Sequence, residues 1–274
     1  MTRRGPHRGF TLIELVVAIT ITAIILVFVT MFIAAPVKAY DQQSRRTKLT
    51  AGPVDAWPLV EADLRVALPN SVRTRRNGSF VALEMLNVND VARYMEPTSL
   101  PFKIAGVMRN TPSPNGTMNG VYLSVGNTGL AGANAYTLTG SMTPASSVQF
   151  AVLAANEQRL TPAPAANLTA TSPKHWVYLV TGPVTYLCDE TQGTIRRYSG
   201  YAVLPNQTSW DSTLEFTTAG VPSMLVARGI TTCNFVVWPL SGGTQQTVAL
   251  HLTATDATGE SVKLLHTYRT EYLP

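Results

Sequence analysis

The sequence predicts an α+β protein, in which a long N-terminal membrane-spanning helix is packed on a mainly antiparallel, β-rich head domain. Residues 10–37 are apolar except for one carboxylate, and the C-terminal part alternates apolar with polar residues between turns. Only 14% of the 274 residues are charged, whereas a disordered or nucleic-acid-coating chain would carry many more charges. The composition therefore favours a folded, membrane-tethered head.

The net charge of +5 is concentrated at the N-terminus, where Arg3, Arg4 and Arg8 precede the apolar run. Without these three residues the chain is nearly balanced, with 18 basic and 16 acidic side chains. The basic isoelectric point is thus a property of the first residues. It gives no reason to expect a nucleic-acid partner.

The apolar run at residues 10–37 is 28 residues long, and a helix needs about 20 residues to cross a bilayer. A secretory signal has an apolar core of only about 7–15 residues. Val37-Lys38-Ala39 nevertheless resembles a small-residue cleavage site. Cleavage there would release a soluble secreted protein, which is the alternative to a retained anchor.

Glu14 is the charged residue inside this run, and a carboxylate in hydrocarbon costs a few kcal/mol. One interpretation is that Glu14 has a function and a cationic partner. The other is that it lies near the lipid headgroups.

Arg8-Gly9-Phe10-Thr11-Leu12-Ile13-Glu14, followed by the apolar run, resembles the leader of type IV pilins and type II secretion pseudopilins. The resemblance implies that residues 1–9 are a leader peptide. It implies that a prepilin peptidase cuts between Gly9 and Phe10 and methylates the Phe10 amine. It also implies that Glu14 pairs with the Phe10 amine of a neighbouring subunit, since a buried charge is tolerable only when it is paired.

Residues 38–69 are predicted to continue the helix outside the membrane. One helical face carries an apolar stripe, which we expect to pack against the head: Trp57, Val60, Leu64 and Leu68. Proline breaks helix interiors, so we expect a kink near Pro36 and a break at residues 52–58, which contain Gly52, Pro53 and Pro58.

Residues 70–274 are predicted to form the β-rich head. Asn77-Gly78 between two extended runs predicts a hairpin. Further strands are expected at residues 120–125, 148–153, 176–180, 184–188, 194–201, 248–254 and 262–268. Residues 161–173 are predicted to be a linker or exposed loop. Residues 101–150 are expected to alternate short strands with long loops.

The chain has two cysteines, Cys188 and Cys233, and their export context predicts a disulfide between two strands of the head. Two free thiols are the alternative. The sequence has no recognisable catalytic or metal-binding motif, so we expect no enzymatic activity, no metal and no cofactor. His251 and His266 could face each other across the last hairpin, in a structural role.

Arg73, Arg75 and Arg76 form a basic cluster without interleaved aromatic residues. We interpret the cluster as a solvated face or an edge that contacts a protein partner, and we expect no nucleic acid there.

Further segments resemble the O-type minor pilins of MSHA-type pili, and the first of them also resembles the J-type minor pseudopilins of type II secretion: residues 63–73, 178–184, 197–201 and 264–266. The implied function is a non-enzymatic minor pilin that helps to initiate or cap assembly of a type IV, MSHA-like pilus. The alternatives are a minor pseudopilin of a type II secretion tip complex and an adhesin or DNA-binding tip module.

The resemblance also implies a location and partners. The protein would be a single-pass protein of the bacterial inner membrane with its head in the periplasm, and it would move to the tip of a pilus or pseudopilus on assembly. Its partners would be the prepilin peptidase, other minor pilins or pseudopilins, and the major pilin.

We predict that the mature protein begins at Phe10 and carries a methylated amine, because Gly9-Phe10 precedes the apolar run. Mass analysis of the N-terminal peptide from the membrane fraction measures this directly. A mature chain that begins at Tyr40 would contradict the prediction and indicate a secreted protein.

Overall fold

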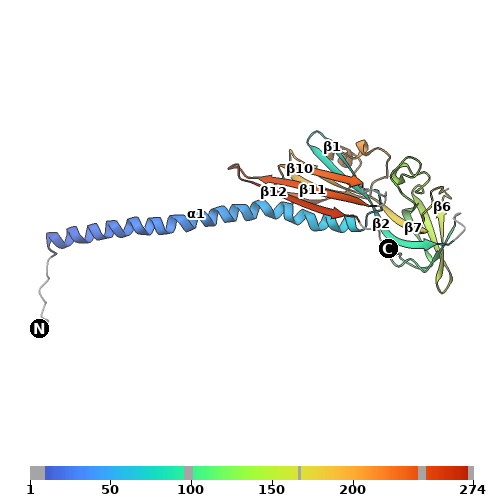
Figure 1. Cartoon of the computed structure of the whole chain (residues 1–274), viewed down its shortest axis with the longest axis horizontal. Coiled ribbons are helices and arrows are strands. Elements are labelled where there is room, and N and C mark those ends of the chain that lie inside the picture. The colour runs from blue at the N-terminus through green and yellow to red at the C-terminus, as the bar shows by residue number, and fades with distance from the viewer. Residues whose placement is uncertain (1–9, 96–100, 166–167, 240–244, 271–274) are drawn as a thin grey trace. The chain divides into compact units, whose positions relative to one another are not determined.

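The computed structural model describes residues 10–95, 101–165, 168–239 and 245–270. It confirms the α+β class, with one long helix followed by a mainly antiparallel β-rich domain (Figure 1). The chain divides into two compact units, Met1–Lys48 and Leu49–Pro274. The helix α1 (Leu12–Arg65) belongs to both units, and each unit is described by itself.

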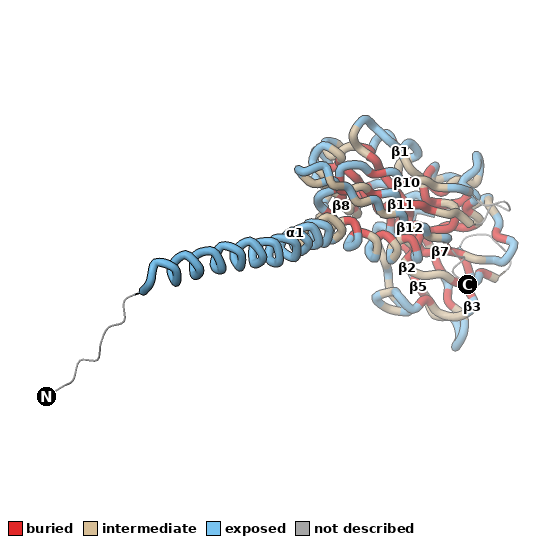
Figure 2. Tube along the Cα trace, turned by 60° about the vertical axis from the view of Figure 1, so that its left-hand side comes forward, coloured by how far each residue is buried: buried red, intermediate tan, exposed pale blue. Residues whose placement is uncertain are grey.

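The first unit contains the N-terminal part of α1, whose residues are exposed through the whole apolar run (Figure 2). In the described part of the chain, α1 is the one helix long and apolar enough to span a membrane. The helix is continuous through Pro36, and the predicted kink at this residue stays a prediction. A single proline removes one backbone hydrogen bond, and the adjacent turns keep theirs.

The predicted break at residues 52–58 is wrong, because α1 remains helical to Arg65. Gly52 lies where a Cβ atom would come within 2.1 Å of the Arg228 carbonyl oxygen, so the missing side chain allows close packing onto the head. The next residue, Pro53, is also buried. Tertiary packing therefore stabilises a helical segment that local propensity disfavours.

Nine antiparallel strands form a sheet in the order β1-β2-β3-β6-β5-β4-β7-β8-β9. These strands are β1 (Arg73–Asn77), β2 (Phe80–Tyr94), β3 (Phe102–Ala105), β4 (Gly116–Val125), β5 (Ser146–Ala154), β6 (Glu157–Ala163), β7 (Trp176–Asp189), β8 (Thr194–Ser199) and β9 (Ser223–Arg228). Because β2 also pairs with β7, the six strands from β2 to β7 close into a barrel. The strands β1, β8 and β9 extend the sheet beyond it.

A second sheet has three antiparallel strands: β10 (Thr232–Pro239), β11 (Gln246–Thr255) and β12 (Ser261–Arg269). The remaining helical elements are short: η1 (Ala135–Thr137), η2 (Gln207–Ser209) and α2 (Thr213–Thr218).

Buried apolar residues of the described head form four clusters, of which two are the largest. In one, Ala56, Val60 and Leu64 of α1 pack with buried residues of β2, β7, β8, β10 and β11, which confirms most of the predicted apolar stripe. Leu68 is buried in a separate cluster. The other large core is the barrel interior, where the buried side chains come from β2 to β7 and their loops. The second half of α1 is therefore a core element that contacts both sheets.

The predicted hairpins are present with small shifts. Residues Gly78 and Ser79 form the first turn, because Asn77 pairs with Phe80, and only Gly78 of these has a positive φ, of 57°. The strands expected at residues 176–180 and 184–188 are one continuous β7. Residues 161–163 belong to β6, so the predicted loop begins later. The strands β6, β9 and β10 were not predicted.

We predict that Gly52→Ala destabilises the head, although helix propensity alone would favour alanine by about 1 kcal/mol. The new methyl group would overlap the Arg228 carbonyl, and such overpacking costs about 1–3 kcal/mol. Thermal unfolding of the detergent-solubilised chain measures the effect. Ala51→Leu adds bulk at the exposed neighbouring position and should change stability by less than about 0.5 kcal/mol. An equal or higher midpoint for Gly52→Ala would contradict the close-packing account.

Candidate functional site

The N-terminal end of α1 is closed by a capping box between Thr11 and Glu14. The Thr11 N–H donates to Glu14 Oε2 at 3.1 Å, and the Glu14 N–H donates to Thr11 Oγ1 at 3.3 Å. The Thr11 hydroxyl lies 3.0 Å from the same carboxylate oxygen. Glu14 therefore satisfies helix-end donors in the single chain.

Phe10 precedes this cap and is 81% exposed, and Gly9 lies outside the described residues. The first basic residue after Phe10 is Lys38, about 36 Å from Glu14 along the helix axis at 1.5 Å per residue. No cationic side chain of the described part of this unit can thus reach the Glu14 carboxylate. Cleavage before Phe10 would create a cation one helical turn away.

The second half of α1 is held to the head by the carboxylate of Asp63. Arg197 on β8 donates from Nε to Asp63 Oδ2 at 2.6 Å and from Nη2 to Oδ1 at 3.1 Å. The Tyr186 hydroxyl on β7 lies 2.6 Å from Oδ2 and 2.8 Å from the Leu59 carbonyl oxygen. Asn87 on β2 donates to Oδ1 at 3.0 Å. We call these four side chains, Asp63, Asn87, Tyr186 and Arg197, the Asp63 clamp.

The contacts of the Asp63 clamp lower the pKa of Asp63 and raise the pKa of Tyr186. Burial would raise the pKa of the Asp63 carboxyl, but hydrogen bonds from Arg197, Tyr186 and Asn87 outweigh it and hold this pKa below its ordinary value. Burial and the adjacent carboxylate raise the pKa of the Tyr186 hydroxyl. The clamp therefore favours an ionised Asp63 and a protonated Tyr186.

Trp57 of α1 stacks on the His266 ring of β12, with ring centroids 4.8 Å apart and planes inclined by 12°. This contact contradicts the expected pairing of His251 with His266. The strand register pairs His266 with Leu250 and His251 with Leu265, so the two histidines point to opposite faces.

Each arginine of the basic cluster on β1 has an ion-pair partner within the head. Arg75 and Arg76 are exposed, as the predicted solvated face requires, and contact with a protein partner stays a prediction. Arg73 donates to the buried Glu84 at 2.8 Å, Arg75 pairs with the buried Asp211, and Arg76 pairs with Glu190 at 2.9 Å. Glu84 lies on the adjacent strand β2. Asp211 and Glu190 lie in loops more than a hundred residues away in the sequence. The three arginines are close together in the sequence, but each binds a different carboxylate.

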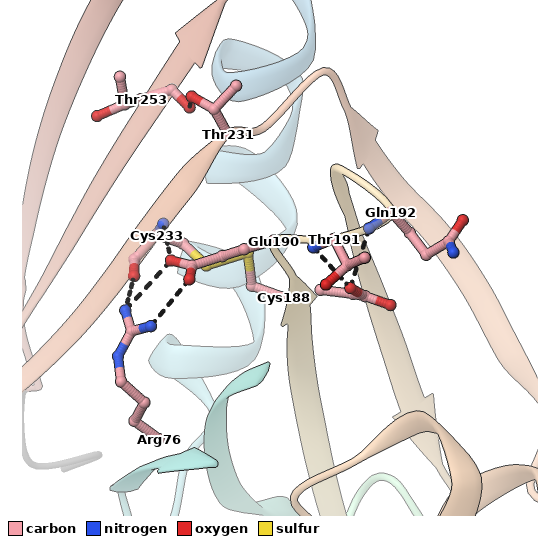
Figure 3. Close-up of a disulfide and its surroundings, with 9 residues drawn as sticks. Arg76, Cys188, Glu190, Thr191, Gln192, Thr231, Cys233 and Thr253 are labelled. Atoms are coloured by element: carbon pink, nitrogen blue, oxygen red, sulfur yellow. Dashed lines mark hydrogen bonds and ion pairs between the residues drawn. A yellow bond between two sulfur atoms is a disulfide. The ribbon is translucent and has the colours of Figure 1, made fainter. Parts of the chain in front are cut away.

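Cys188 of β7 and Cys233 of β10 form the predicted disulfide, with Cα atoms 6.6 Å apart (Figure 3). Beside it, Glu190 accepts from the Cys233 N–H at 2.9 Å, and Arg76 donates to the Cys233 carbonyl oxygen at 2.6 Å. The disulfide and this ion pair join the three-stranded sheet to the nine-stranded sheet. In the chain-entropy account, closing this loop contributes roughly 4 kcal/mol.

Comparison with known proteins identifies the N-terminal segment. Residues 4–30 match the family model of the prokaryotic N-terminal methylation motif. No curated protein and no solved structure matches the chain. The matched residues include the predicted cleavage site, the capping box and the first part of α1.

The chain therefore carries a prepilin leader of the type IV pilin kind, and this motif supports a subunit of the type IV pilin or pseudopilin type. Such a leader implies processing by a prepilin peptidase and assembly with other pilins. With the apolar helix, it indicates a membrane-anchored, single-pass protein.

The cleavage position at Gly9 and Phe10, the methylation of Phe10 and the role of Glu14 remain predictions. Sequence reasoning missed the Asp63 clamp. The available signal was that Asp63 is a charged residue close to Val60 and Leu64, which belong to the predicted apolar stripe. Nothing in the sequence indicated that Arg197 would be its partner.

We predict that Asp63→Asn destabilises the head by about 2 kcal/mol or more, because Arg197 would lose its carboxylate in a partly buried position. Chemical denaturation of the detergent-solubilised chain measures the loss. Asp55→Asn is the matched control, since Asp55 is exposed on the same helix and should change stability by less than about 0.5 kcal/mol.

The Asp63 clamp also predicts how stability depends on pH. The pKa of Asp63 is lower in the folded chain than the ordinary value of about 3.9 in an unfolded chain. Its stabilising contribution is therefore complete well above pH 4 and is lost as the pH falls through the folded pKa. In Asp63→Asn, the free energy of unfolding should therefore decrease less steeply as the pH falls below about 4. A decrease as steep as that of the parent would contradict the assignment.

Proposed function

We propose that the protein is a non-enzymatic minor pilin, which helps to initiate or cap assembly of an MSHA-like type IV pilus. The N-terminal segment supplies the processing site and the assembly helix. The head supplies a large folded domain joined to that helix.

The observation that carries this proposal is the Asp63 clamp. Two of the segments that resemble O-type minor pilins, residues 63–73 and 197–201, contribute its charged pair. The segment at 178–184 lies in β7, which supplies Tyr186. Segments that resemble O-type minor pilins therefore meet where the helix joins the head. This supports the proposal that the head packs on the helix in the same way as in those pilins.

A structural role is also supported by how the head uses its buried charges. Asp63, Glu84 and Asp211 each bind an arginine from another element, and Glu190 binds Arg76. These carboxylates hold elements together. The disulfide supports a head in an oxidising compartment, which is the periplasm for an inner-membrane subunit of this type.

Deletion of the gene in its own host tests the pilus role against the secretion role. Loss of surface pili with normal export of secreted enzymes would support the minor pilin. Normal pili with lost enzyme export would contradict it and assign a minor pseudopilin.

We predict that Glu14 serves assembly, so Glu14→Val should leave insertion, cleavage and head folding intact while reducing recovery of partner pilins. A carboxylate in an apolar seam is stabilised by a neighbour's Phe10 amine, whereas valine offers no charge. Processing by mass analysis and partner recovery by pull-down are measured on the same sample.

Thr11→Val is the control for the capping box. It removes the hydroxyl that contacts Glu14 but keeps the Thr11 backbone N–H donor and the carboxylate. Partner recovery should therefore survive Thr11→Val. Full recovery with Glu14→Val would show that the carboxylate is not the docking charge.

A further inference from the structure

Four basic residues follow the apolar run of α1 within eleven residues: Lys38, Arg45, Arg46 and Lys48. All four are exposed, and the helix passes through them without interruption. The same stretch contains one carboxylate, Asp41, so its net charge is +3, from four basic residues and one acidic residue. We call residues 38–48 the basic segment. It begins directly after the last residue of the apolar run.

The stability of α1 itself does not explain the basic segment. Cations stabilise a helix within its last turn, whereas this segment ends 17 residues before the helix does. Opposite charges three or four residues apart also stabilise a helix, and Asp41 has this spacing to Lys38 and Arg45. Neither Arg46 nor Lys48 has a carboxylate at that spacing. The cluster therefore points to a partner outside the helix.

The apolar run alone does not fix the depth of α1 in a membrane. At 1.5 Å per residue its 28 residues are about 42 Å long, whereas the hydrocarbon layer is about 30 Å thick. An upright helix can thus slide by about 12 Å and still fill the layer with residues of this run.

The charges at the two ends of the run select one depth. Glu14 and Lys38 lie about 36 Å apart along the axis, and the bilayer with its headgroups is about 40–45 Å thick. Both charges leave the hydrocarbon only when the helix lies within about 3 Å of a centred position. Lys38 then lies in the headgroup layer nearest the head, and Glu14 lies in the opposite headgroup layer.

The headgroup layer at this depth selects anionic phospholipids. Lysine and arginine donate hydrogen bonds and accept none, so phosphate oxygens suit them. A zwitterionic headgroup has its own ammonium, which offsets its phosphate, whereas an anionic headgroup keeps its net charge. Arg45 lies about 10 Å beyond Lys38, where its long side chain and the field of the surface still meet. Each cation close to an anionic surface strengthens binding about fivefold.

We propose that the basic segment of α1 binds anionic phospholipid headgroups in the leaflet nearest the head, and that this contact sets the depth of the helix. Phe10 and Glu14 then lie in the opposite headgroup layer, where water solvates the Glu14 carboxylate. The proposal requires only the membrane anchor, so it does not depend on a pilus role.

Native mass spectrometry of the full chain in non-ionic detergent tests the proposal. The chain is titrated with phosphatidylglycerol or with phosphatidylcholine of the same acyl chains, so the two dissociation constants differ only through the headgroup. The parent should bind phosphatidylglycerol at least about fivefold more tightly.

The test variant combines Lys38→Gln, Arg45→Gln, Arg46→Gln and Lys48→Gln. Glutamine has nearly the helix propensity of lysine and arginine, so α1 should stay helical. The preference for phosphatidylglycerol should fall to less than about twofold, because the headgroup charge loses its partners. Binding of phosphatidylcholine should not change, which shows that the span is intact.

The matched control also replaces two lysines and two arginines, at exposed positions of the head: Lys103→Gln, Arg109→Gln, Arg159→Gln and Lys263→Gln. It should keep the parent's preference. Lys38→Gln alone should lower the preference more than Lys48→Gln alone, because Lys38 lies about 15 Å closer to the membrane along the helix axis. This order tests the proposed depth.

Three results would overturn the proposal. The first is that the parent binds both lipids equally, or that the test variant keeps the parent's preference. The second is that the control loses as much preference as the test variant, which would indicate an effect of total charge. The third is that inorganic phosphate at the same concentration displaces phosphatidylglycerol, which would assign the basic segment to a soluble anion.

Discussion

The ion pair between Asp63 and Arg197 is the contact on which the head's architecture depends. It fixes a helix in a core that two sheets share, and it does so where the helix contains a glycine and two prolines. Gly52 lets the backbone approach β9, Pro53 is buried, and the next turns bury Ala56, Val60 and Leu64. Apolar burial supplies most of the attraction, and the clamp fixes the rotation of the helix about its axis.

The same helix contains the residues that we propose for assembly. Its first residues carry the methylation motif and the Thr11–Glu14 capping box, and its last turns are part of the head's core. The disulfide and the Arg76–Glu190 pair then join the second sheet to the first. Each link connects elements distant in the sequence and adds to the apolar core that α1 and both sheets share.

Much of this could be predicted from the sequence, and the failures have physical causes. Length and apolarity identify the span, alternation identifies the last hairpin, and two cysteines in an exported chain identify the disulfide. The break at residues 52–58 was wrong, because tertiary packing overrides propensity. The ion pairs of the β1 arginines were not predicted, because two of the three carboxylate partners, Asp211 and Glu190, lie far away in the chain. The Asp63 clamp depends on strand register and helix packing, which no local pattern reveals.

A double-mutant cycle between Asp63 and Arg197 tests the central claim most directly. The free energy of unfolding is measured for the parent, Asp63→Asn, Arg197→Gln and the double variant, all in the same detergent. If the pair fixes the helix in the head, the two losses are not additive, and the coupling energy exceeds about 1 kcal/mol. Additive losses, with a coupling energy near zero, would show that apolar burial holds the helix without the clamp.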